Sequence, residues 1–139
     1  MDVWKSDRLW LIFPAIFSLA LSLLLGGCGD EERRAGDAAK WLKTYSQTNP
    51  PNSEWLATNI AVDDKGRVVM DVLVPDEGQV DLIKSRTHVE QTHIVRMACP
   101  PKTAKVWTIL TVDQVLWINL LEKSKTGLYG PVASAYCRH

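Results

Sequence analysis

The chain has 139 residues, of which 46% are hydrophobic and 23% are charged, and 16 Lys and Arg residues balance 16 Asp and Glu residues. This length is enough for one domain with a sizeable hydrophobic core. Because no basic excess is available to neutralise phosphates, the composition gives no electrostatic support for nucleic-acid binding. We therefore expect no nucleic-acid partner.

The N-terminal segment has the pattern of an export signal. Lys5 and Arg8 supply positive charge ahead of an apolar run over residues 9–25. A basic start, an apolar middle and small residues before a cleavage point are typical of secretory signals. The run is also close to the shortest length that can span a membrane, so an uncleaved single-span anchor is the alternative.

The run ends in Leu25-Gly26-Gly27-Cys28, which resembles the lipobox of bacterial lipoproteins. The resemblance implies that the Cys28 thiol receives a diacylglyceryl group, that residues 1–27 are removed as a signal peptide, and that the new amino group is acylated. Two acyl chains anchor a protein stably, whereas one anchors it only marginally. In such lipoproteins an Asp after the cysteine favours inner-membrane retention. Gly29 stands there, so we expect the periplasmic face of the outer membrane.

After the signal, residues 28–36 are polar and charged without apolar periodicity, and they predict a short tether. A single folded domain is expected over residues 37–139. Asp37 can cap a short helix whose apolar residues recur at the spacing of a half-buried helix. These residues are Ala38, Trp41, Leu42 and Tyr45.

A β-hairpin is predicted next, with strands over residues 54–62 and 67–74. Two sets of alternating apolar residues are each expected to share one face of their strand. They are Leu56, Ile60 and Val62 in the first strand, and Val68, Met70, Val72 and Val74 in the second. The connector suits a type I turn closed by Gly66 in the left-handed region. Asp63 and Asp64 could form a metal site or an acid/base pair, but Asp in a turn commonly bonds its own backbone, which we favour.

A long helix is predicted from Asp76 to about Ala98, where Cys99-Pro100-Pro101 ends it. Three polar residues, Arg86, Glu90 and His93, interrupt its apolar arc at spacings of four and three, which places them side by side. A Glu–His pair could perform acid/base chemistry with an arginine steering an anion. An ion-paired helix edge is the structural alternative, and we favour it.

The remaining cysteines predict a disulfide. With Cys28 acylated, Cys99 and Cys137 are left, and in an oxidising envelope an even remainder indicates one bond, with Cα atoms under about 7 Å apart. Two buried free thiols are the alternative. A thiolate site with His139 would require reduced cysteines, and His88 and His93 are five residues apart, unlike the paired ligands of a zinc helix. We predict no metal and no cofactor.

The C-terminal part predicts two further strands, over residues 115–122 and 128–137, after a segment at 102–110 that fits either a short helix or a strand. Residues 115–122 are apolar on both faces, which suits a central strand covered on both sides. The order helix, strand, strand, helix, strand, strand predicts an α+β fold. We expect a four-stranded antiparallel sheet packed by one long helix, plus the short N-terminal helix.

Three functional hypotheses follow. The first is a membrane-anchored periplasmic lipoprotein that acts as a structural or assembly component of an envelope complex, with an envelope protein as partner. The second is a periplasmic binding module in which Arg86 converges with Trp55, Trp107 and Trp117 on a small ligand. The third is an enzyme that uses Glu90 and His93. The sequence has no Gly-rich phosphate loop, Ser/His/Asp spacing or Cys-x-x-Cys motif, and this favours the first hypothesis.

Overall fold

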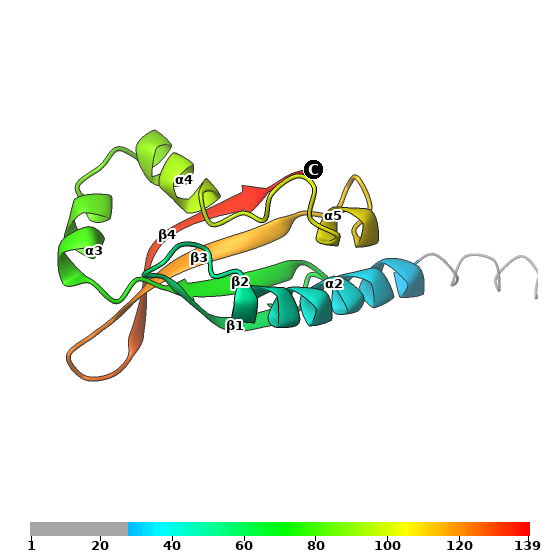
Figure 1. Ribbon diagram of the computed structural model, residues 1–139, viewed down its shortest axis with the longest axis horizontal. Coiled ribbons are helices and arrows are strands. Elements are labelled where there is room, and N and C mark those ends of the chain that lie inside the picture. The colour runs from blue at the N-terminus through cyan, green and yellow to red at the C-terminus, as the bar shows by residue number, and fades with distance from the viewer. Residues whose placement is uncertain (1–27) are drawn as a thin grey trace, which may run out of the picture. The chain divides into compact units, whose positions relative to one another are not determined.

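The computed structural model describes residues 28–139, so the apolar run and Leu25-Gly26-Gly27 lie outside the described residues. Residues 31–139 form one compact unit. Its elements are α2 (Cys28–Thr48), β1 (Leu56–Val62), β2 (Val68–Leu73), α3 (Glu77–Lys84), α4 (His88–Arg96), α5 (Val106–Ile109), β3 (Leu116–Lys123) and β4 (Tyr129–Cys137) (Figure 1). Within residues 28–139, no helix has both the length and the hydrophobicity to cross a bilayer.

The α+β class and the four strands are confirmed, but the sheet is mixed. Its order is β1-β2-β3-β4, with both hairpins antiparallel and the central pair β2 and β3 parallel. The expectation of a fully antiparallel sheet is therefore wrong. The connection over residues 74–115 carries α3, α4 and α5 and returns the chain to the end of the sheet where β2 began. A parallel pair requires such a crossover.

The expected long helix is divided into α3 and α4 by residues 85–87, so the predicted helix order is also wrong. Thr87 adopts an extended backbone with φ −63° and ψ 157° and forms a capping box with Glu90. Its side chain accepts a hydrogen bond from the Glu90 amide, and this starts a new helix in place of continuing the old one. The segment at 102–110 contains the helix α5, which was one of its two expected forms.

Helix α2 begins at Cys28, nine residues before the expected start at Asp37, so residues 28–36 are helical. Its first turns pack on the domain. Arg34 Nη1 donates to the Ile109 carbonyl at 3.3 Å, and Gln114 Nε2 donates to the Glu31 carbonyl at 2.9 Å. Small apolar residues continue the stripe of Leu42 toward the N-terminus and are buried, namely Ala35, Ala38 and Ala39.

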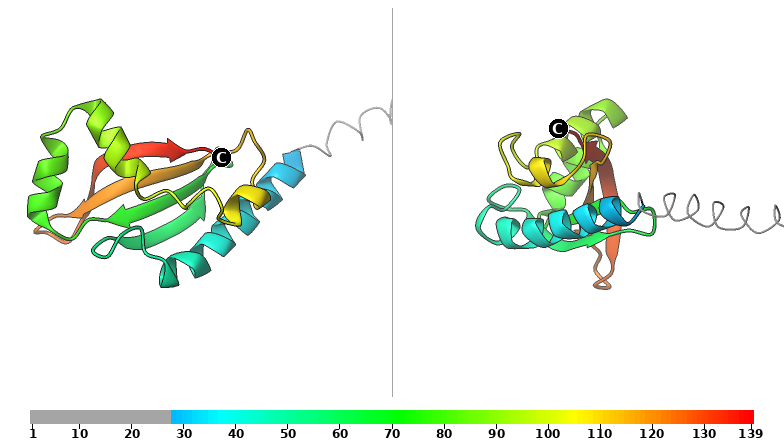
Figure 2. Two further views of the ribbon diagram at one scale, coloured as in Figure 1. Left: turned by 45° about the horizontal axis from the view of Figure 1, so that its top comes forward. Right: turned by 90° about the vertical axis from the view of Figure 1, so that its right-hand side faces the viewer.

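The core lies between the helices and one face of the sheet (Figure 2). Alternate residues along the strands point to this face and are buried, namely Ile60, Val68, Met70, Val72, Leu116, Ile118, Leu120, Ala135 and Cys137. Leu56 was expected to join Ile60 on this face but is 54% exposed. The register shifts between Ala57 and Asn59, and this bulge reverses the alternation of β1, so the prediction for Leu56 is wrong.

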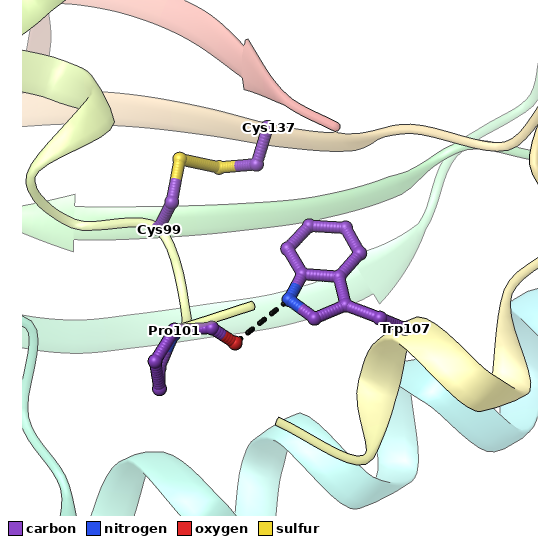
Figure 3. The surroundings of a disulfide bond; sticks show 4 residues. All are labelled: Cys99, Pro101, Trp107 and Cys137. Atoms are coloured by element: carbon purple, nitrogen blue, oxygen red, sulfur yellow. Dashed lines mark hydrogen bonds between the residues drawn. A yellow bond between two sulfur atoms is a disulfide. The ribbon is translucent and has the colours of Figure 1, made fainter. Parts of the chain in front are cut away.

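The expected pairing of Cys99 with Cys137 is present, with Cα atoms 5.8 Å apart (Figure 3). The bond joins the segment after α4 to the last residue of β4. Beside it, Trp107 Nε1 donates to the Pro101 carbonyl at 2.9 Å, which satisfies the polar atom of a buried indole. The disulfide therefore fastens the helical layer to strand β4, one edge strand of the sheet.

Candidate functional site

The predicted polar cluster is a helix cap. Glu90 Oε2 accepts hydrogen bonds from the Thr87 amide at 2.9 Å and the Thr87 hydroxyl at 2.8 Å, and Arg86 lies 3.7 Å from the same carboxylate. The Thr87 amide bond, its hydroxyl bond and the Arg86 charge lower the pKa of Glu90 despite some desolvation. Within the described residues no hydrogen bond or ion pair joins His93 to this pair, and its side chain is exposed. Arg86 and Glu90 thus come together, and His93 does not join them.

The tryptophans of the ligand-binding hypothesis do not converge. Trp55 is buried and its Nε1 donates to Gln79 at 2.9 Å, while Trp107 is buried beside the disulfide. Trp117 points to the opposite face of the sheet, where its neighbours are half-buried. Arg86 lies on the surface and pairs with Glu90. Within residues 28–139, therefore, these four side chains do not line a common pocket.

The turn acid Asp63 has the structural role that was favoured. Its Oδ1 accepts from the Lys65 amide at 3.0 Å and the Arg67 amide at 2.8 Å, and Arg67 pairs with its Oδ2 at 2.7 Å. Desolvation raises the pKa of Asp63, but the hydrogen bonds from Arg67 and Lys65 outweigh it and lower the pKa overall. Gly66 has φ 73°, as the turn type predicts. In the described part of the chain no three His, Cys, Asp or Glu side chains are grouped to hold a metal ion.

The candidate site is the face of the sheet opposite the helices, which no described helix covers (Figure 2). The pairing registers align its side chains in three cross-strand rows. We name them the leucine row (Leu56, Leu73, Leu121, Pro131), the polar row (Asn59, Asp71, Asn119, Ser134) and the aromatic row (Ala61, Val69, Trp117, Tyr136). Neighbouring rows are two residues apart along β2 and β3, about 7 Å, and a bulge in each edge strand adds one residue between the leucine row and the polar row.

The polar row is held by a continuous hydrogen-bond network. The Asp71 carboxylate accepts from Asn119 Nδ2 at 2.8 Å and from Asn59 Nδ2 at 3.1 Å. Asn119 Oδ1 in turn accepts from Trp117 Nε1 at 2.9 Å. Because these bonds hold Asn59, Asp71 and Asn119 in place, this part of the row presents a fixed polar surface.

The aromatic row is flanked by arginines. The rings of Trp117 and Tyr136 stack with centroids 6.1 Å apart. The Arg67 guanidinium lies 5.1 Å from the Trp117 centroid, and those of Arg138 and Arg96 lie 4.7 and 5.6 Å from the Tyr136 centroid. These are cation–π distances.

The leucine row supplies apolar surface at the other end of the strands. Leu56 is 54% exposed, Pro131 is exposed, and Leu73 and Leu121 are half-buried. Apolar side chains beside a hydrogen-bonded polar row are typical of a protein-docking surface.

Sequence reasoning singled out Trp117 but missed Asp71, Asn119, Leu121 and Tyr136 as members of one surface. The available signal was the strand over residues 115–122, whose two apolar faces predict a cover on each side. In the structure, helices of residues 28–139 cover one face of this strand and leave the other face uncovered.

No protein-family model matches the sequence, and neither a curated protein nor a solved structure has significant similarity to it.

Proposed function

We propose that the protein is a lipid-anchored lipoprotein of the bacterial envelope that serves as a structural or assembly component. Its domain would dock a partner protein on the leucine and polar rows of the uncovered sheet face. The anchor would be the acylated Cys28, and the expected location is the periplasmic side of the outer membrane.

One observation carries the docking role. Strand β3 is apolar on both faces, and its Leu116, Ile118 and Leu120 are buried while Leu121 on the other face is only half-buried. Burial of apolar surface stabilises by about 25 cal/mol per Å², so a partner that covered the exposed leucines of this face would be stabilising. The fixed polar row would then determine which partner fits, because an unmatched buried polar group is costly.

Two further features support the compartment. The Leu25-Gly26-Gly27-Cys28 sequence resembles a lipobox, and the pairing of Cys99 with Cys137 fits an oxidising compartment such as the periplasm. Gly29 stands where an Asp would favour the inner membrane.

The test is photo-crosslinking in intact cells with a photoreactive amino acid at Leu56. Leu82 on α3 is a matched control, because it is 53% exposed and Leu56 is 54% exposed, while only Leu56 belongs to the uncovered face. We expect a discrete protein adduct from position 56 and none from position 82. Equal adducts from both positions, or none from position 56, would contradict docking through this face.

A further inference from the structure

Glu31 on α2 and the aromatic row lie at the same end of the domain. Gln114, two residues before β3, bonds to the Glu31 carbonyl at 2.9 Å, and Leu116 at the start of β3 pairs with Cys137 at the end of β4. Three chain steps separate Cys28 from Glu31, so their Cα atoms cannot be more than about 11 Å apart. This anchor-proximal end would therefore lie close to the bilayer.

Two arginines at this end lack a carboxylate partner. Arg96 and Arg138 both approach the ring of Tyr136, and among residues 28–139 neither forms an ion pair. Arg67 at the other end of the aromatic row is different, because Asp63 neutralises it at 2.7 Å. Both guanidinium charges are therefore available to an anion.

The surroundings of these arginines fit a lipid surface. A groove of about 550 Å³ between α4 and β4 is lined by Arg96, Trp117 and Tyr136 and has no Asp or Glu in its lining. The loop that leads into β3 exposes Val112, with 86% of the residue accessible. Tryptophan, tyrosine and arginine together are typical of the headgroup region of a bilayer.

We infer that the anchor-proximal end rests on the bilayer that holds Cys28, with Arg96 and Arg138 binding phosphates of anionic phospholipids. Trp117 and Tyr136 would then lie at headgroup level. This inference rests on the proposed lipid anchor. It leaves the leucine row, at the far end of the strands, free for the protein partner. An acidic protein would offer the same negative charge. Glu31 is only three residues along the chain from the acylated Cys28, however, and this proximity to the bilayer favours phospholipid as the ligand of the arginines.

Hydrogen–deuterium exchange on the acylated full mature protein tests the inference. The protein is reconstituted in vesicles of phosphatidylcholine alone and of equal parts phosphatidylcholine and phosphatidylglycerol. We expect slower exchange in residues 111–115 and 134–139 in the anionic vesicles. The hairpin over residues 124–128, at the opposite end, should exchange equally in both.

The R96Q/R138Q variant should lose this protection. A cation near an anionic bilayer changes the docked-to-undocked ratio by about fivefold, so the two together change it by roughly 30-fold. The K123Q/K125Q variant removes the same charge from exposed positions at the far end and should behave like the wild type.

Three results would overturn the inference. The first is an equal exchange rate of the acylated protein in both kinds of vesicle. This result would contradict the inference but not the proposed function. The second is a protein adduct in place of a phospholipid adduct from a photoreactive residue at Arg138 in cells. The third is a mature chain with an unmodified Cys28 thiol, which would also remove the proposed function.

Discussion

Loss of the Cys99–Cys137 bond should destabilise the domain strongly. The cysteines are 38 residues apart, and closing a loop of that length stabilises a fold by about 4 kcal/mol on the chain-entropy model. For a domain of this size, the midpoint of thermal unfolding should then fall by roughly 15–25 °C. The bond also holds the end of α4 near β4, where Arg96 lies over Tyr136.

The assay is urea unfolding followed by circular dichroism, with and without a thiol reductant. When its disulfide is reduced, the wild type should have a free energy of unfolding that is lower by about 4 kcal/mol. The C99A/C137A variant should start at the lower stability and show no response to the reductant. A reduced wild type that loses less than about 1 kcal/mol would refute the reasoning, because loop closure would then contribute little.

Three further predictions concern the cap and the two faces of β3. Thr87→Ala removes the capping box and should lower the free energy of unfolding by about 1 kcal/mol in urea, and an unchanged midpoint would count against the cap. The folded-state pKa of Glu90 is depressed, so its stabilisation is present above its ordinary value of 4.5 and is lost as pH falls through the folded pKa. Acid unfolding of Glu90→Gln should accordingly show a weaker pH dependence than that of the wild type, and identical curves would oppose this. Leu120→Ala empties a fully buried site and should cost about 2–5 kcal/mol, while Leu121→Ala on the uncovered face should cost less than half as much. Equal losses would mean that both faces are buried.

Local patterns predicted the hairpin and the last two strands. Alternation in residues 67–74 determined which side chains of β2 face the core, and the turn from Asp63 to Gly66 has the expected conformation. These features depend on residues close in sequence. The local pattern therefore carried the information that they needed.

The errors arose where a local pattern was overridden or misread. The Thr87-His88-Val89-Glu90 sequence contains the capping-box spacing that divides the long helix, whereas the prediction treated Glu90 as part of an ion-paired edge or a site within one continuous helix. The bulge beside Thr58 reversed the face of Leu56, because a single extra residue shifts the two-residue period. The N-terminal extension of α2 depends on the distant residues Ile109 and Gln114, which no local pattern reveals.

The strand directions and the uncovered face could not be predicted from local patterns. The parallel pairing of β2 and β3 depends on where the helical connection returns the chain, which is a tertiary property. The three rows likewise require the registers of four strands at once. The two apolar faces of β3 gave the only sequence signal for this surface, and they indicated a missing cover without its identity.

Intact-mass spectrometry of the protein purified from membranes tests the central claim most directly. Our account predicts a chain that begins at Cys28 and carries the added mass of a diacylglyceryl group and an amide-linked acyl chain. A full-length chain that retains residues 1–27 and a free sulfhydryl at Cys28 would contradict it.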